Sequence, residues 1–293
     1  MDIVFNINHL GLEGMGPTLT SLIRNCSAPQ KLKLWFIYTD FEPGDQENIL
    51  KLLVGEGYTQ KPEFVYFDAK AIFGHLLSLQ GDWTAYGRLL IPRTVKSDTA
   101  LYLDADLIIL SDVLTLENFD FGDKPYAAVH GSAVKWCLEK DFFIENQGWD
   151  PETPYFNSGV VLFNIKRWNE LDIDTAIDEL TKEHGILLRS HDQTLLNLYI
   201  KGQFAILPDI YNVPWYPASQ RPENSEKAIL HFVGSPKPWD ISGSLVHFGY
   251  KVWASYNTPF WKKTYGKYSK VKFERTWNIR RSIIRSLKKK LKN

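Results

Sequence analysis

Residues 102–110 read YLDADLIIL. The apolar run ALYL, at 100–103, leads directly into Asp104 and Asp106, and a second apolar run follows these two aspartates. A short uncharged run of this kind predicts a buried strand that ends at Asp104. Unpaired carboxylates at the end of a buried strand would be costly, and a divalent cation would remove that cost.

Apolar runs and helix-like segments alternate on both sides of this stretch. We expect strands at 3–7, 34–39, 63–67, 100–103, 157–165 and 228–232, and helices at 18–25, 45–55, 86–95, 172–184 and 190–199. This alternation predicts an α/β fold with a Rossmann-like, mostly parallel sheet and helices on both faces. Ligands bind beyond the carboxyl ends of the strands in such sheets, which is where Asp104 and Asp106 would lie.

The composition is that of a globular protein, with 44% hydrophobic residues among 293. Cys26 and Cys137 are far apart and lack metal-type spacing, so we expect free thiols in a reducing compartment. The first residues resemble a strand rather than a signal peptide, and no apolar run reaches 18 residues. We therefore expect a cytoplasmic protein without a membrane span.

The neutral net charge hides an asymmetry. Residues 262–293 contain thirteen basic residues and one acid, Glu274, so the rest of the chain is acidic. Trp277, Ile284, Leu287 and Leu291 would form one stripe of a helix in this segment. That pattern is typical of an interfacial helix on anionic lipid, although a helix packed on the catalytic domain or a disordered tail would also fit. No nucleic-acid motif accompanies the charge, so we expect no nucleic-acid partner.

A second polar pattern, HFVGSPKPW, occupies residues 231–239. His231 ends a short predicted strand and could be a third metal ligand, while Lys237 could meet a diphosphate as a point charge. Gly234 would allow close approach of the backbone. The alternatives are a buried core histidine and an ordinary surface lysine. Carboxylate ligands favour Mg²⁺ or Mn²⁺.

Four motifs occur in order: YLDAD at 102–106, YFNSGVVLFN at 155–164, HDQTLLN at 191–197 and HFVGSPKPW at 231–239. Together they resemble glycosyltransferase family 8, which includes bacterial lipopolysaccharide galactosyl- and glucosyltransferases and glycogenin. The resemblance extends from Met1 to about Trp239. It implies a GT-A fold, a UDP-sugar donor, Mn²⁺ and retention of the anomeric configuration. We expect a GT-A catalytic domain at 1–260 and a basic amphipathic tail at 261–293.

The resemblance implies a metal and diphosphate site. Asp104, Asp106 and His231 would hold Mn²⁺, with Mg²⁺ as a possible substitute, against the diphosphate of a UDP-hexose. Lys237 and the backbone at Gly234 would assist. An imidazole among carboxylates favours Mn²⁺ over Mg²⁺.

The resemblance also implies contacts with the rest of the donor. The main chain of Ala105 would lie beside the ribose or the uracil. Asn6 and Asn8 end the strand that binds uridine, where family members usually carry an aspartate at the position of Asn8. Arg88 would reach the donor sugar and its phosphate, and Asn157 would lie near the sugar. The alternatives are a salt-bridged helical arginine and a strand-capping asparagine.

The catalytic residues implied by the resemblance are Asp192, a ligand of a donor-sugar hydroxyl, and Gln193, which would face the anomeric carbon. An amide is a poor nucleophile, so we favour front-face departure and attack, with Asp192 as the other candidate nucleophile. The stretch Ser190-x-x-Gln193 also fits a capping box, in which Gln193 would bond back to the amide of Ser190.

Two other functions fit parts of the sequence. A sugar nucleotidyltransferase would need a glycine-rich loop with basic residues after the first strand, but GLEGMG at 11–16 has no basic residue before Arg24. A catalytically inactive, membrane-associated carbohydrate-binding protein would not need the three metal ligands. We therefore expect transfer of galactose or glucose to a glycan or lipid-linked acceptor, at the inner face of the cell membrane. Residues 130–155 and 208–222 are the expected acceptor groove.

Overall fold

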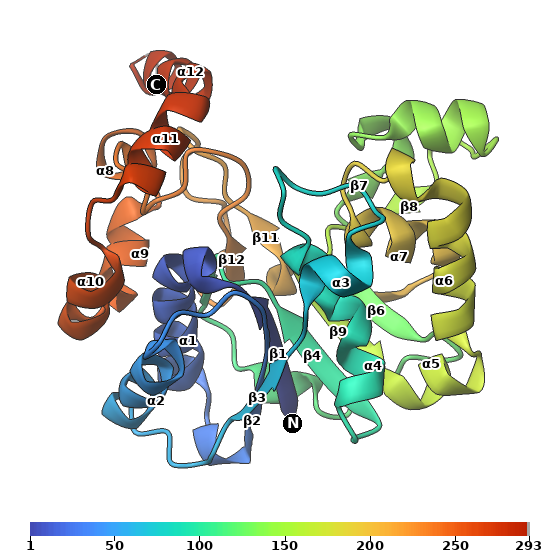
Figure 1. The fold of residues 1–293 in the computed structure, drawn as a ribbon, viewed down its shortest axis with the longest axis horizontal. Helices are drawn as coiled ribbons and strands as arrows, with labels where there is room; N and C mark the ends of the chain where they lie inside the picture. Colours follow the sequence, from blue (N-terminus) through green and yellow to red (C-terminus); the bar gives the residue numbers. More distant parts are fainter. Residues whose placement is uncertain (292–293) are drawn as a thin grey trace.

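A seven-stranded sheet crosses the centre of the protein (Figure 1). In the computed structural model, which describes residues 1–291, its strand order is β10-β6-β9-β4-β1-β2-β3. β9 is antiparallel to both of its neighbours, and the other pairs are parallel. The predicted mostly parallel sheet is therefore confirmed. Its strands are β1 (Asp2–Ile7), β2 (Lys33–Tyr38), β3 (Glu63–Tyr66), β4 (Thr99–Leu103), β6 (Tyr126–Val129), β9 (Val160–Asn164) and β10 (Ala205–Leu207).

Two small sheets carry the remaining strands. The first has the order β11-β12-β5, and the second pairs β7 with β8. The first holds His231 beside the aspartates, because β12 is antiparallel to β5, with His231 opposite Leu107. The bounds are β5 (Leu107–Ile109), β7 (Ser132–Ala133), β8 (Pro154–Tyr155), β11 (Val213–Pro214) and β12 (Ile229–His231).

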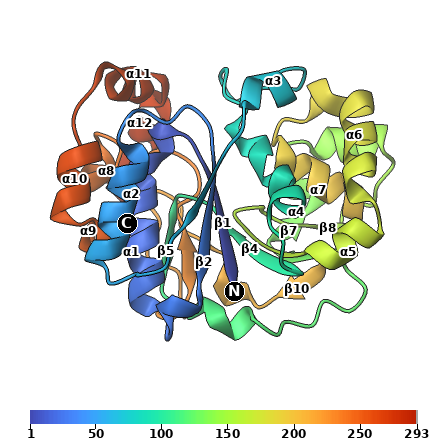
Figure 2. The ribbon, with the colours of Figure 1, turned by 60° about the horizontal axis from the view of Figure 1, so that its bottom comes forward.

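Helices cover both faces of the central sheet, as predicted (Figure 2). One core contains Phe5 of β1 with residues of α1, α2 and α10, and the other contains Val4 of β1 with residues of α3–α7. Alternate side chains of β1 thus enter two apolar layers, as expected of a strand buried on both faces. The helices are α1 (Leu12–Asn25), α2 (Asp45–Gly55), α3 (Ala69–Phe73), α4 (Ile91–Thr94), α5 (Ile165–Glu170), α6 (Ile173–His184), α7 (Asp192–Ile200), α8 (Gly243–Val246), α9 (Tyr250–Tyr256), α10 (Pro259–Tyr265), α11 (Lys270–Asn278) and α12 (Arg280–Lys290).

α1 begins at Leu12, six residues before the predicted start. Gly14 and Gly16 disfavour a helix, yet both lie in its first turns, where other groups pack closely against them. A Cβ on Gly14 would lie 2.8 Å from the carbonyl oxygen of Ala105, and one on Gly16 would lie 2.1 Å from the ring of Trp261. Close packing therefore outweighs the roughly 1 kcal/mol by which glycine disfavours a helix.

The basic tail forms helices that lie against the rest of the protein. Trp261 is fully buried in the core with α1, and its Nε1 donates a hydrogen bond of 2.8 Å to the carbonyl oxygen of Leu12. α11 and α12 follow, and the last two residues of the predicted tail, Lys292 and Asn293, lie outside the described residues. No helix within residues 1–291 is long and apolar enough to cross a membrane.

Candidate active site

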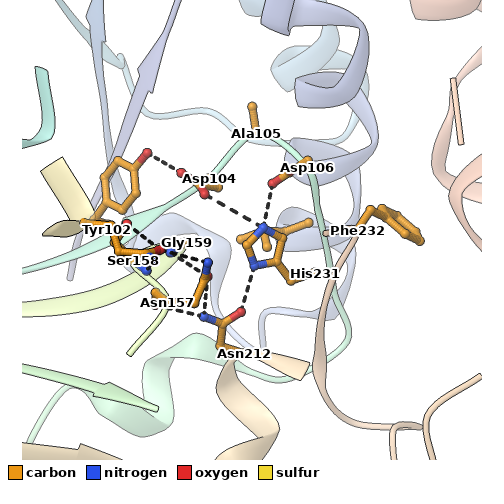
Figure 3. A network of polar contacts seen from close by, with 12 residues as sticks. Tyr102, Asp104, Ala105, Asp106, Asn157, Ser158, Gly159, Asn212, His231 and Phe232 are labelled. Atoms are coloured by element: carbon orange, nitrogen blue, oxygen red, sulfur yellow. Dashed lines mark hydrogen bonds and ion pairs between the residues drawn. The ribbon is translucent and has the colours of Figure 1, made fainter. Parts of the chain in front are cut away.

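The three predicted metal ligands converge beyond the carboxyl end of β4 (Figure 3). Asp104 and Asp106 follow β4, and His231 ends β12. The Nε2 of His231 lies 3.2 Å from Asp106 Oδ1 and 3.9 Å from Asp104 Oδ2. Gly159 makes room for this arrangement, since a Cβ there would lie 2.4 Å from the His231 ring. Three side chains that can bind a metal, all predicted from their positions at strand ends, therefore surround one point.

Asn212 orients the His231 ring, and the sequence had not indicated this residue. Its Nδ2 donates to the main-chain and side-chain oxygens of Asn157 at 3.2 and 3.1 Å, so its Oδ1 faces His231 Nδ1 at 2.9 Å. A carbonyl oxygen can only accept, so His231 Nδ1 carries the proton. The lone pair of Nε2 is then left pointing at the two aspartates, which is the form that binds a metal.

The donor set fits a divalent cation. Asp106 Oδ1 is buried and has no hydrogen-bond donor within residues 1–291, yet it lies 3.2 Å from the unprotonated Nε2. Two lone pairs that face each other at this distance repel unless a cation lies between them. Burial opposes the charge of Asp106, but the Lys237 ammonium outweighs it and holds the pKa of this carboxyl well below its usual range. The site is thus prepared in its ligating, charged form.

Lys237 lies at the rim of the metal site. Its Nζ is 2.6 Å from Asp106 Oδ2 and also donates to the carbonyl oxygen of Phe232. Gly234, in the same loop, has a φ of +76°, which favours glycine. The nearest atom to a Cβ there would be 4.0 Å away. Among the described residues, Gly234 is thus required by its backbone conformation rather than by crowding.

Arg88 joins the metal ligands to Asp192. It lies on the 3₁₀ helix η3 (Thr84–Leu90) and is 6% exposed. Its Nε is 2.8 Å from Asp192 Oδ2, one terminal nitrogen is 3.0 Å from Asp104 Oδ1, and the other donates to the carbonyl oxygen of Ser158 at 2.5 Å. Tyr102 lies under the guanidinium and donates to the same Asp104 oxygen.

The environment of Asp192 raises its pKa to about 7. Burial is the main cause; Arg88 lowers the pKa, and the charge of Asp104 raises it. The carboxyl group therefore changes its charge near neutral pH. That behaviour is typical of functional sites, although structural networks also produce it.

Gln193 points at Asn157 rather than at the end of its own helix. Its Oε1 accepts hydrogen bonds from Asn157 Nδ2 and from the amide of Ser158, both at 3.0 Å, and its Nε2 donates to the Tyr155 hydroxyl at 3.1 Å. The amide of Ser190 instead donates to Glu139. The capping-box alternative is therefore wrong.

A cavity of about 260 Å³ adjoins the metal ligands at the carboxyl ends of β1 and β4. Asn6 lines it and donates to main-chain oxygens of η3. Asn8 also lines it, but its Oδ1 accepts a 3.0 Å hydrogen bond from the Gly11 amide, so one lone pair remains for a ligand. The lining residues are Asn6, Ile7, Asn8, Gly11, Asp82, Thr84, Ala85, Arg88, Tyr102, Asp104, Ala105, Asp106 and Trp239.

Comparisons with known proteins show the family to which the chain belongs. The chain matches the model of the family described as glycosyl transferase family 8 over residues 2–242. It therefore belongs to this family, as the four motifs predicted.

Two relatives show how far the similarity extends. The chain is 24% identical over 270 residues to the lipopolysaccharide 1,3-galactosyltransferase of Salmonella typhimurium, covering 88% of this chain and 79% of that protein. It is 25% identical over 266 residues to general stress protein A of Bacillus subtilis, covering 83% and 90%. The crystal structure of the galactosyltransferase LgtC with donor and acceptor sugar analogues has a TM-score of 0.71 at 22% identity, covering 87% of this chain and 95% of that one. The fold is thus GT-A.

Proposed function

We propose that this protein is a Mn²⁺-dependent, retaining hexosyltransferase that moves galactose or glucose from a UDP-sugar to a glycan or glycolipid acceptor. The convergence of Asp104, Asp106 and an oriented His231 beside a cavity carries the proposal. The relatives support a hexose, since they include the galactosyltransferase above and a lipopolysaccharide 1,2-glucosyltransferase of Escherichia coli that is 28% identical over 165 residues.

In this proposal the metal site would bind the diphosphate of the donor, and the cavity would bind its nucleoside. Asp104, Asp106 and His231 would hold the ion, which when bound neutralises the charge that grows on the leaving diphosphate. Lys237 adds a second positive charge at the same edge, with the backbone at Gly234 beside it. Asn6, Asn8 and the main chain of Ala105 would contact the nucleoside, because they line the cavity next to the ligands.

The sugar would lie toward two pairs of residues. Arg88 is paired with Asp192, and Asn157 is hydrogen-bonded to Gln193. Ser158 connects the two pairs, because it contacts both Arg88 and Gln193. Asp192 would accept a hydrogen bond from a sugar hydroxyl. Gln193 presents an amide, which is a poor nucleophile, so front-face departure and attack remains the favoured course. Asp192 is the other candidate nucleophile.

A donor assay tests the function. The protein should hydrolyse UDP-galactose or UDP-glucose slowly in Mn²⁺, and a chelator should stop the reaction. Activity with a sugar phosphate and UTP instead would indicate a nucleotidyltransferase, against which the helical conformation of GLEGMG already counts. Binding of a glycan without turnover of either donor would indicate an inactive carbohydrate-binding protein.

Gln193→Ala should lower kcat for UDP-sugar hydrolysis by about tenfold or more while donor KM changes little. The Gln193 side chain is hydrogen-bonded to Asn157, Ser158 and Tyr155, beside the place where the sugar would lie. Its loss should therefore disturb the binding of the sugar rather than that of the nucleotide. Steady-state kinetics on purified protein measure the split. Gln193→Glu is the matched variant, because it keeps the shape but cannot donate to Tyr155 when ionised. A rise in KM at unchanged kcat would contradict this role.

The tail is proposed to bind an anionic membrane surface at the inner face of the cell membrane. Other residues bond α11 and α12 to the rest of the protein, but the predicted stripe is exposed, with Trp277 at 67% and Leu291 at 86% exposure. Three basic residues of α12 flank the stripe: Arg281, Arg285 and Lys288. An exposed apolar stripe among basic residues is what an interfacial helix requires.

Changing Arg281, Arg285 and Lys288 together to glutamine should weaken binding to phosphatidylserine vesicles by on the order of 100-fold, since each basic residue contributes about 1 kcal/mol near such a surface. Cosedimentation measures the change, and binding of the unaltered protein should weaken as salt rises. The matched control changes three exposed lysines of the catalytic domain, Lys61, Lys140 and Lys201. Equal loss in both triple variants would mean that the tail has no special role.

A further inference from the structure

Helix α11 is bonded to the loop that carries Lys237, although it lies beyond the residues matched by the family model. Arg275 forms a two-point contact with Asp240: Nε to Oδ1 at 2.6 Å, and a terminal nitrogen to Oδ2 at 3.1 Å. The Asp240 side chain is only 5% exposed. The Arg275 side chain is 42% exposed, but a bidentate arginine–carboxylate contact still restrains both position and orientation.

Asp240 in turn closes the turn that presents Lys237. Its Oδ2 accepts a 2.6 Å hydrogen bond from the amide of Lys237, and its own amide donates to the Lys237 carbonyl oxygen at 3.1 Å. The Lys237 ammonium then reaches Asp106, a proposed metal ligand. Trp239 lies between Lys237 and Asp240 in the sequence, and it lines the cavity. A chain of direct contacts thus connects Arg275 to the edge of the metal site.

A second ion pair attaches α11 to the first turn of α1, which packs against Trp239. The Nζ of Lys272 is 2.6 Å from Oε2 of Glu13, which is buried in the first turn of α1. Burial raises the pKa of Glu13 to about 7, and Lys272 acts against this rise. The next residue, Gly14, lies so close to Trp239 that a Cβ would be 2.9 Å from its ring. α11 is therefore bonded to Asp240, which follows Trp239 in the chain, and to the turn of α1 that packs against the Trp239 ring.

We propose that α11 is part of the donor-binding apparatus, and that Arg275 is a positioning residue which acts on Lys237 through Asp240. This inference rests on the proposed UDP-sugar function. Without Arg275, the Asp240 side chain loses its two-point partner, and the turn that carries Lys237 loses its outer restraint. Donor binding should suffer more than the chemical step, because Arg275 itself touches no reacting group.

Arg275→Ala in the full-length protein should raise the Kd for UDP, measured by calorimetry in excess Mn²⁺, by about 10-fold, in the range found for residues that orient ligating groups. KM for UDP-sugar hydrolysis should rise in parallel, with kcat within about twofold. Arg275→Lys should recover part of the loss, because it restores the charge but not the two-point geometry. Arg280→Ala is the matched control, since Arg280 is an exposed arginine of α12 that has no ion pair within residues 1–291 and is not among the residues proposed to bind a membrane.

Two further measurements separate the possible failures. Amide hydrogen exchange of residues 232–243 should be faster in Arg275→Ala than in Arg280→Ala, whether or not the protein uses UDP. In an Asp240→Asn background, Arg275→Ala should have little additional effect on UDP affinity. Unchanged exchange, or faster exchange with unchanged UDP affinity, would overturn the positioning role. Failure of the unaltered protein to bind UDP would instead overturn the proposed function, and the exchange result would still report on the restraint by α11.

Discussion

Asp106→Asn should abolish UDP-sugar hydrolysis in Mn²⁺, with a rate loss of more than ~100-fold, because loss of a ligating charge should exceed the 10–100-fold effect of residues that only orient ligands. Asparagine keeps the shape of the side chain but removes the charge that faces His231 Nε2 and Lys237. Initial rates across a Mn²⁺ titration give the effect. Circular dichroism and a thermal melt should show the same fold.

Asp112→Asn is the matched control for this experiment. Asp112 is the N-cap of the 3₁₀ helix Val113–Leu116 and is outside the cavity lining. Asparagine caps as well as aspartate, so neither stability nor activity should change. Normal turnover by Asp106→Asn would show that the metal site has been wrongly assigned.

Arg88→Ala should produce the largest loss of stability, about 3–5 kcal/mol in the free energy of unfolding, because it leaves the buried carboxylate of Asp192 and the partly buried carboxylate of Asp104 without their shared cation. Denaturant unfolding measures the loss. Arg88→Lys should retain part of the stability, since it keeps the charge but cannot reach Asp192, Asp104 and the Ser158 carbonyl oxygen together.

The loss caused by Arg88→Ala should depend on pH. Burial raises the pKa of Asp192 in the folded protein to about 7, and Arg88 acts against that rise. A carboxyl whose folded pKa lies above its unfolded value near 4 favours folding at low pH, and this contribution is lost as pH rises from about 4 to 7. Removing Arg88 raises the folded pKa further, so the variant should be destabilised more at pH 8 than at pH 5. An equal loss at both values would mean that Asp192 is not the group left uncompensated.

The parts of the site that lie at strand ends were predictable. Asp104, Asp106 and His231 follow short apolar runs, and the carboxyl ends of strands in an α/β sheet meet at one edge. Their convergence, the mostly parallel sheet and the family followed from patterns that are local in sequence. Local patterns carry this information because strands and helices have fixed periods.

Other contributions depend on contacts between distant residues, which no local pattern records. Asn212 lies in a stretch without periodicity, and its role comes from amide hydrogen bonds to Asn157, 55 residues away. The pair between Lys272 and Glu13 spans 259 residues. The start of α1 was missed for the same reason, because the glycines in its first turns are explained by groups packed on them from elsewhere in the chain.

The position of Trp261 has a consequence for folding during synthesis. Its ring fills the notch at Gly16 of α1 and bonds to Leu12, 249 residues earlier in the chain. The first helix of the protein therefore cannot complete its packing until nearly nine-tenths of the chain has left the ribosome. Until then the surface of α1 around Gly16 remains uncovered, as expected for folds that depend on contacts between distant parts of the sequence.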